Sequence, residues 1–288
     1  MTDIAEERYA QAVKRRQREG RGRGAGPDYK PWLTVRSFGP KSNTFRTFGK
    51  TGRTHHLLSG GELNCFALLN RSPSVVDIRE QFPLLPLSKT QEIAQELAIR
   101  HPRARASNRR DAPEVDVVMT TDFLVDLADV DGLPAHIAVS VKDVRDLDEN
   151  TPKKLANLLD KAEIERRYWA KLGVPFRIIS GADIPDVVAR NVRLLHKHAD
   201  LAGIDLPAPV TELADHLFDR FETARDLAVR DHCKNFDKAM GLEPGTGVSI
   251  VWHSIAVGAW QVDLNERLNP AAPLLGLRCS IDSMEPQG

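Results

Sequence analysis

Three charged residues, Glu62, Asp122 and Lys142, stand at the ends of segments whose patterns predict regular structure. Two carboxylates that leave one side open hold Mg²⁺ while waters and phosphate oxygens complete its ligands. A lysine beside a metal-bound water lowers the pKa of that water or orients it for in-line attack on phosphorus. The types and spacing of these residues therefore indicate metal-dependent hydrolysis of a phosphodiester.

Each of these residues also has a purely structural interpretation. Glu62 follows Ser59 by three positions and fits the second half of a capping box. Asp122 fits a strand-end residue and Lys142 a surface lysine, so the spacing alone leaves the alternatives open. The neighbouring pair His55–His56 lacks the helical spacing of a zinc site, which favours a loop or phosphate contact.

The helix that carries Glu62 has a clear start signal. Ser59 is a suitable cap, and the apolar residues that follow it recur at helical spacing. Residues 74–82 (SVVDIREQF) predict a strand that Pro83 ends. Residues 101–115 are basic and polar, which indicates a loop.

Two further segments predict an antiparallel hairpin. Residues 121–127 alternate in polarity, Asp131–Gly132 marks a turn, and residues 136–142 (HIAVSVK) predict the returning strand. Such a hairpin brings Asp122 and Lys142 to the same end of the sheet.

A long helix and a buried strand complete this part of the fold. Thr151 is a suitable N-cap, Pro152 occupies the first helical position, and Gly173 ends the helix. Residues 174–179 predict a buried strand. We therefore expect an α/β fold whose mixed sheet is flanked by helices.

Residues 183–270 predict a small, mostly helical domain with a wing-like strand. The expected helices and strand lie near residues 186–201, 211–222, 224–241, 247–257 and 260–264. The Pro-rich residues 271–288 are expected to form a loose tail.

The charges are unevenly distributed, although 40 Lys and Arg balance 40 Asp and Glu over the 288 residues. Residues 1–53 hold 13 basic and 5 acidic side chains, whereas residues 183–288 hold 10 basic and 16 acidic ones. Within the basic arm at residues 1–53, residues 1–19 predict a short charged helix that the glycines of residues 20–27 end. Glycines between the arginines of residues 20–27 favour a flexible strap along a phosphate backbone; a solvated tail is the alternative. The expected DNA contacts of the arm are Arg21, Arg23, Lys30 and Arg53. The catalytic domain is then expected over residues 54–182.

Several classes of protein do not fit this composition. No segment approaches the roughly 20 apolar residues that a membrane helix needs, so we expect a cytosolic protein with no membrane partner. Cys65, Cys233 and Cys279 are isolated, which argues against a disulfide framework and a cysteine zinc site. The glycine-rich phosphate loops of ATP- and NAD-binding domains are also missing from the sequence.

Six sequence blocks carry a resemblance to a known family. They are EGRG (19–22), DYKPWLTV (28–35), GRTHHLLS (52–59), DIREQFPLLP (77–86), TDFLVD (121–126) and ERRYW (165–169). Together they closely resemble the TnsA endonuclease family, transposon-encoded enzymes that cut the 5′ strands at element ends within a heteromeric transposase. The resemblance covers about residues 19–180 and, more weakly, the C-terminal domain.

The resemblance implies a restriction-endonuclease-like catalytic domain. Its metal-binding Glu on the first helix, Asp on a central strand and Lys on the next strand fall on Glu62, Asp122 and Lys142. Mg²⁺ is the expected metal, with Mn²⁺ able to substitute. The family pattern has an acidic residue or Gln two positions before the lysine, and this chain has Ser140 there, so water or the Val141 carbonyl is the expected further ligand. The expected supporting contacts around these ligands come from Ser140 and Glu165.

The resemblance also implies partners. These are double-stranded DNA at transposon ends, a strand-transferring transposase subunit, and an AAA+ ATPase regulator that binds a winged-helix-like C-terminal domain. The expected location is the bacterial cytoplasm, on the nucleoid when the protein is bound to DNA. Independently, the expected recognition helix at residues 248–258 has no Lys or Arg, which favours a protein partner over reading of a DNA groove. Two alternatives stay open: a catalytically weak DNA-bridging or regulator-docking subunit, which Ser140 favours, and a free-standing restriction-type nuclease.

Overall fold

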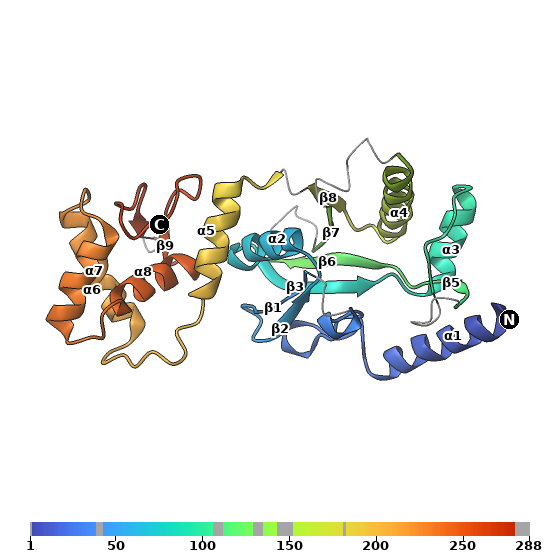
Figure 1. The fold of residues 1–288 in the computed structure, drawn as a ribbon, viewed down its shortest axis with the longest axis horizontal. Coiled ribbons are helices and arrows are strands. Elements are labelled where there is room, and N and C mark those ends of the chain that lie inside the picture. The colour runs from blue at the N-terminus through green and yellow to red at the C-terminus, as the bar shows by residue number, and fades with distance from the viewer. Residues whose placement is uncertain are drawn as a thin grey trace, which may run out of the picture. The chain divides into compact units, whose positions relative to one another are not determined.

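The structure is a computed structural model of the chain, and it describes residues 2–38, 43–105, 112–128, 135–142, 152–180 and 183–279. The chain divides into two compact units, Met1–Asp183 and Ile184–Gly288 (Figure 1). Within the residues described, no helix is both long and apolar enough to cross a membrane.

A four-stranded mixed sheet forms the centre of the N-terminal unit (Figure 1). Its strands, in spatial order, are β3 (Val75–Pro83), β6 (Thr120–Leu127), β7 (His136–Lys142) and β8 (Phe176–Ser180). β6 is antiparallel to both β3 and β7, whereas β8 runs parallel to β7. The expected mixed sheet and hairpin are therefore confirmed. The turn expected at Asp131–Gly132 lies outside the described residues.

Helix α2 (Gly60–Arg71) covers one face of this sheet. The helix begins where the sequence predicts, because the Ser59 hydroxyl accepts a hydrogen bond from the Glu62 amide at 3.0 Å. Its Phe66 ring lies 6.5 Å from the ring of Phe123 on β6. Burial of these two aromatic side chains fixes the first turn of α2 above the end of β6.

Helices α3 (Leu87–Glu96) and α4 (Pro152–Lys171) cover the opposite face. Neighbouring residues on a strand point to opposite faces, so the residue after Phe123 packs on this side. The buried core here contains Leu84, Ile93, Leu124, Ala138, Ile164 and Trp169. Thr151, the expected cap of α4, lies outside the described residues.

The N-terminal segment packs against the sheet, so the prediction of a flexible strap is wrong for its described part. Helix α1 (Thr2–Arg18) leads to a segment in which the Gly22 amide donates to Lys30 O at 2.6 Å. Tyr29 and Trp32 are 3% and 1% exposed, and the Trp32 amide donates to the Gln81 carbonyl of β3 at 3.2 Å. Burial of two aromatic side chains outweighs the flexibility of the glycines.

Two short hairpins flank the sheet. β1 (Phe45–Phe48) pairs with β2 (Thr54–Leu57), which leads into α2. β4 (Arg103–Arg105) pairs with β5 (Glu114–Asp116), so the prediction of a plain loop over residues 101–115 is wrong at both of its ends. The cause is tertiary, since Val115 is buried against the rest of the unit.

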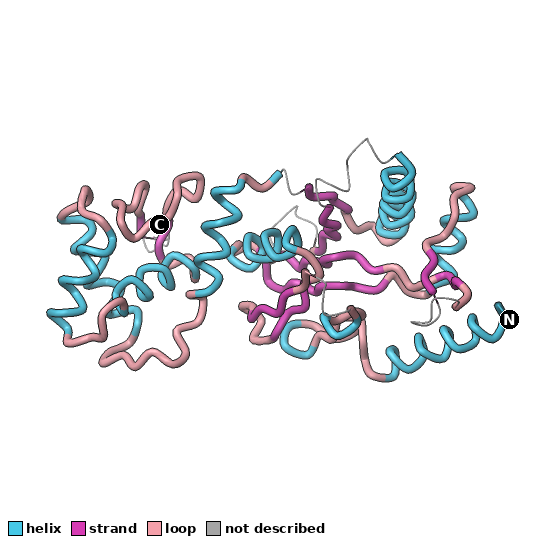
Figure 2. Tube along the Cα trace, viewed as in Figure 1, coloured by secondary structure: helices cyan, strands magenta, loops and turns pink. Residues whose placement is uncertain are grey.

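The C-terminal unit is mostly helical (Figure 2). Its elements are α5 (Asp186–Lys197), α6 (Val210–Thr223), α7 (Val229–Met240), α8 (Thr246–Ala256), β9 (Trp260–Gln261) and β10 (Arg278–Cys279). Helix α8 contributes Ile250, Val251 and Ile255 to the core, each 0% exposed. A helix buried in this way does not present a side to a DNA groove, and its apolar residues form the unit's own core. The winged-helix character of this unit stays a prediction.

The chain after residue 270 is less loose than expected. Leu274 packs into the core of the C-terminal unit, and β10 pairs with β9. The expectation of a loose tail is therefore wrong for residues 271–279, while residues 280–288 lie outside the described part of the chain.

Candidate active site

Glu62, Asp122 and Lys142 lie close together at one end of β6. The Asp122 carboxylate accepts a hydrogen bond from the Val141 amide at 2.7 Å and lies 3.9 Å from the Lys142 ammonium. Glu62 is linked to this end of the sheet by Gln81, whose Nε2 donates to Glu62 Oε2 at 3.3 Å, and the charge of Asp122 adds to burial in raising the pKa of Glu62. The structure thus brings together the three residues that the sequence singled out.

A row of residues across three strands builds this end of the sheet. The ladder between β3 and β6 pairs Glu80 with Phe123 and Phe82 with Thr121, so Gln81 stands opposite Asp122. The ladder between β6 and β7 ends at Phe123 and Val139. Beyond that pair, the Val141 amide donates to the Asp122 side chain. The carboxylate therefore fixes the end of β7 beside β6.

Glu62 is held at the start of α2 by backbone and side-chain donors. Its Oε2 accepts from the Leu58 amide at 2.8 Å and from Gln81 Nε2 at 3.3 Å. The Ser59 hydroxyl makes its half of the capping box, but the Glu62 carboxylate reaches Leu58. Burial, with the charge of Asp122 as a second cause, raises the pKa of Glu62 to about 8.

Glu165 joins the site from α4, on the other side of the sheet. It is 4% exposed, and its Oε1 accepts from the Thr121 hydroxyl at 2.6 Å. Trp169 Nε1 donates in turn to Thr121 Oγ1 at 2.7 Å. Burial and the charge of Asp122 raise the pKa of Glu165 to about 8, while Lys142 and hydrogen bonds from Thr121 and Ser140 act against this shift.

Ser140 connects the lysine to the carboxylates. Its Oγ accepts from Lys142 Nζ at 2.6 Å and lies 3.4 Å from Asp122 Oδ2. A neutral hydroxyl at this point orients the lysine without adding a further negative charge. A supporting role for Ser140 beside the metal ligands stays a prediction.

The donor set fits a hard cation that keeps several waters. Within the described ranges, no three His, Cys, Asp or Glu side chains form a ready metal cage. Glu62 and Asp122 supply two carboxylates; burial, with the charge of Asp122 as a second cause, raises the pKa of Glu62, and a bound cation would favour its ionised form. Mg²⁺ is commonly held by one or two carboxylates with waters and phosphate oxygens as its other ligands.

Arg53 does not lie where the sequence analysis placed it. Its guanidinium is buried and makes two hydrogen bonds to Glu80, at 2.9 and 2.6 Å. Glu80 also accepts from the His56 amide at 3.1 Å and lies 2.9 Å from His55 Nδ1. The expectation that Arg53 contacts DNA is therefore wrong, because its cation is consumed in an internal ion pair. The pair ties β2 to β3.

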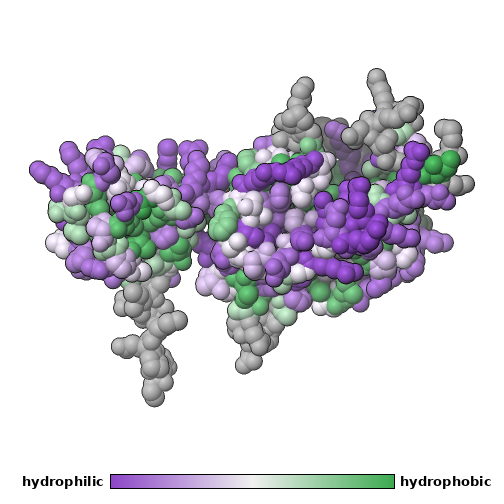
Figure 3. Space-filling model, turned by 90° about the horizontal axis from the view of Figure 1, so that it is seen from below, coloured by the Kyte–Doolittle hydropathy of each residue, from purple (hydrophilic) through white to green (hydrophobic). Residues whose placement is uncertain are grey.

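The other expected DNA contacts lie on the surface. Arg23 and Lys30 are exposed and bridge one another's backbones. The Arg21 side chain is 29% exposed and pairs with Glu19 at 2.8 Å. Figure 3 shows that hydrophilic side chains dominate the visible face of the N-terminal unit.

Two residues of this site were missed by the sequence analysis. The Gln81 side chain donates to Glu62 through Nε2 and accepts a hydrogen bond from the Thr120 hydroxyl through Oε1 at 3.1 Å. Gln81 has φ of +49°, a conformation that non-glycine residues rarely adopt and that concentrates at functional sites. Thr121 links Glu165 to Trp169. Both lie in sequence blocks already noted, but only the strand register shows what they contact.

Comparisons with known proteins identify the family of this chain. The family described as "TnsA-like endonuclease N terminal" matches residues 72–181, and "TnsA endonuclease C terminal" matches residues 183–264. A similar protein is the transposon Tn7 transposition protein TnsA of Escherichia coli, which is 40% identical over 240 residues, or 82% of this chain and 80% of that protein. The chain matches two domains in succession and is 40% identical to this relative over most of both chains, so it belongs to the TnsA endonuclease family.

Proposed function

We propose that this chain is a Mg²⁺-dependent endonuclease that cuts the 5′ strands at transposon ends during cut-and-paste transposition. The observation that carries the proposal is the cluster of Glu62, Asp122 and Lys142 at the end of β6. Its substrate is double-stranded DNA at the transposon ends. A partner transposase subunit joins the other strands.

In this proposal Glu62 and Asp122 hold the metal, with Val141 O or water as a further ligand. When bound, Mg²⁺ polarises the scissile phosphate and makes its bound water a stronger nucleophile. Lys142, fixed by Ser140 at 2.6 Å, orients the attacking water and offsets the negative charge that develops on the phosphate. Glu165, hydrogen-bonded to Thr121, supports the end of β6 that carries Asp122.

The C-terminal unit is proposed to bind a protein, the AAA+ ATPase regulator. Its central helix α8 is buried, so the surface of α6 and α7 is what a partner meets. Acidic, exposed side chains gather along α6 and the turn that follows it: Glu212, Asp219, Glu222 and Asp226. Such a surface repels a phosphate backbone at long range and suits a basic protein partner.

The test is strand-specific cleavage of a transposon-end duplex in Mg²⁺, with and without the partner transposase. Asp122→Asn and Glu62→Gln are expected to abolish cutting of the 5′ strand. Glu62→Gln keeps an acceptor for the Leu58 amide, so it separates loss of charge from loss of the helix cap. Lys142→Met is expected to lower the cleavage rate on the order of 10²- to 10³-fold, the range for one lost electrostatic stabiliser.

Asp126→Asn is the matched control, because Asp126 lies on the same strand but pairs with Arg79 and His136. Wild-type cutting by Asp122→Asn would refute the assignment. Absence of cutting by the wild-type chain under all conditions would favour the non-catalytic DNA-bridging subunit. Cutting of any DNA without the transposase would favour a free-standing nuclease.

A further inference from the structure

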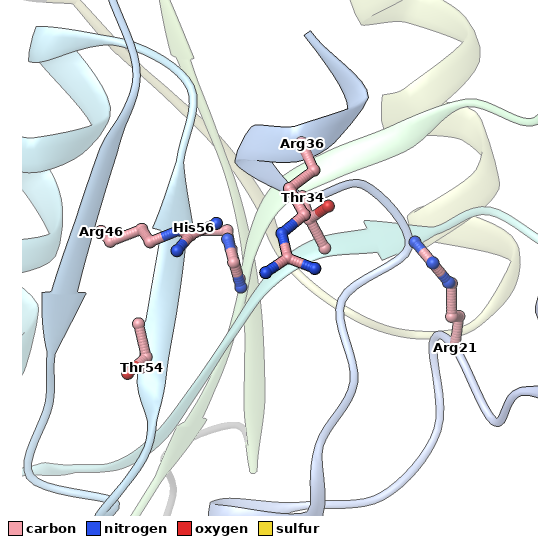
Figure 4. A pocket seen from close by; sticks show the side chains of 6 residues that line it. All are labelled: Arg21, Thr34, Arg36, Arg46, Thr54 and His56. Carbon is pink, nitrogen blue, oxygen red and sulfur yellow. The ribbon is translucent and has the colours of Figure 1, made fainter.

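A basic pocket lies on the N-terminal unit. It has a volume of about 370 Å³ and is lined by Arg21, Thr34, Arg36, Arg46, Thr54 and His56. Figure 4 shows that these side chains come from three separate segments: the residues after α1, the turn around Thr34, and the β1–β2 hairpin. None of the six lining residues is acidic. The lining is therefore suited to an anion.

The pocket contains donors with fixed directions. The Val35 amide donates to His56 Nδ1 at 3.4 Å, so the proton of the neutral ring sits on Nε2. Burial, and to a lesser degree the charges of Arg46 and Arg53, lowers the pKa of His56, while Glu80 opposes the shift. The ring thus stays neutral near pH 7 and offers one N–H donor. Arginine guanidiniums bind phosphate oxygens in a fork, which makes Arg36 and Arg46 suitable partners.

A chain of hydrogen bonds connects this pocket to Glu62. Arg21 Nη1 donates to Trp32 O at 3.4 Å, the Trp32 amide donates to Gln81 O at 3.2 Å, and Gln81 Nε2 donates to Glu62. On the other side, His56 of β2 lies two residues before Leu58, whose amide also binds Glu62. Segments on both sides of the pocket are therefore linked to the two groups that donate hydrogen bonds to Glu62, the Gln81 side chain and the Leu58 amide.

We propose that this pocket binds a single backbone phosphate of the DNA strand opposite the strand to be cut. This contact fixes the register of the duplex over Glu62 and Asp122. Arg36 and Arg46 contact the same phosphate, and His56 Nε2 donates to it. This inference rests on the proposed function for the choice of DNA as the anion. It assigns roles to Arg36 and Arg46 that the sequence pattern did not assign, and it gives His56 a defined part in the phosphate contact that the sequence left open for His55–His56.

The test is binding of a fluorescent duplex to the full chain in EDTA, followed by anisotropy over a range of NaCl concentrations. EDTA prevents cleavage, so the result does not depend on whether the chain is a nuclease. Arg36→Gln, Arg46→Gln and the double variant are compared with the wild type. Each phosphate contact contributes roughly 0.9 to the slope of log K against log salt. Because both arginines share one phosphate, the double variant is expected to lose about 0.9 in slope, and each single variant most of that.

The matched control is Arg100→Gln with Arg167→Gln. These two exposed arginines of the same unit pair with Glu114 and Glu163 and lie outside the pocket, so the control removes the same net charge. A second arm compares His56→Gln, which keeps a donor, with His56→Leu, which removes it; only His56→Leu is expected to weaken binding.

Three outcomes would overturn the proposal. The first is a slope in the double pocket variant that equals that of the wild type or of the control. The second is a loss of about 1.8 that is the sum of the two single losses, since this would mean two separate surface contacts. The third is equal binding by His56→Leu and His56→Gln. If the pocket variants lose slope as expected but the wild-type chain does not cut end DNA in Mg²⁺, that result would count against the proposed function and leave the pocket standing.

Discussion

Replacement of Arg53 by Met is expected to destabilise the N-terminal unit strongly. Arg53 makes hydrogen bonds of 2.9 and 2.6 Å to Glu80 and one of 2.6 Å to Ile78 O. The Glu80 side chain is 0% exposed and that of Arg53 is 7% exposed. Removal of one partner of such a buried pair costs about 3–5 kcal/mol, because it leaves an uncompensated charge in the interior. At about 1.4 kcal/mol per factor of ten, opening of β3 becomes roughly 10²- to 10⁴-fold more frequent.

The assay is amide hydrogen exchange of the full chain. The two compact units make a single unfolding free energy ill-defined, so local exchange is the better measure. Peptides from β3 and β6 report on the N-terminal unit, and peptides from α8 serve as the internal reference. Arg100→Met is the matched control, since Arg100 is 72% exposed and pairs with Glu114 at 3.5 Å, where about 0–1 kcal/mol is expected.

A second variant tests the cause of the effect. Arg53→Met combined with Glu80→Gln removes the buried negative charge along with its partner, so the double variant is expected to be less destabilised than the sum of the two single variants. The reasoning fails if Arg53→Met exchanges like Arg100→Met in β3. It also fails if Arg53→Met lowers the salt slope of DNA binding by about 0.9 with β3 unchanged, because Arg53 would then be a phosphate contact.

Three further predictions concern pH, the lysine and the C-terminal unit. Burial alone would raise the pKa of Glu80, but hydrogen bonds from His55 and Arg53 hold it at about 2. Because the pKa of Glu in the unfolded chain is about 4.3, ionised Glu80 contributes on the order of 3 kcal/mol to the free energy of unfolding. This contribution is present above about pH 4.3 and is lost as the pH falls toward 2. Pulse proteolysis with pepsin in urea should show this loss in the wild type and a flatter profile in Glu80→Gln. Ser140→Ala removes the hydrogen bond of 2.6 Å from Lys142 Nζ and is expected to slow cleavage about 10- to 100-fold in single-turnover assays. An undiminished rate would show that Lys142 does not need this hydrogen bond to act. Asp237→Ala leaves the Gly245 and Gly247 amides at the start of α8 without their acceptor, so a loss of about 1.5–3 kcal/mol is expected, seen as faster exchange in α8 with β3 as the reference.

The regular elements around the site follow from short-range patterns in the sequence. Ser59 starts α2 because its hydroxyl satisfies an amide of the first turn, and that contact needs no other part of the chain. Alternating polarity predicts β6, because one side of a strand must be buried. The hairpin of β6 and β7 then brings Asp122 and Lys142 near each other. The start of α2 and the alternation of β6 depend on residues a few positions apart, and the hairpin joins two strands that follow one another in the chain.

Contacts between distant segments were decided by the tertiary structure alone. Arg53 and Arg21 look alike in the sequence, yet one is buried against Glu80 of a neighbouring strand and the other lies at the surface. Gln81 meets Glu62 only because the register of β3 and β6 sets it opposite Asp122. The sequence predicted α8 as a helix, but only packing against α5, α6 and α7 shows that it is the core of its unit. A local pattern indicates whether a side chain prefers water or the interior. The partner of a buried charge depends instead on which strands pair, and strand pairing is determined by contacts throughout the chain.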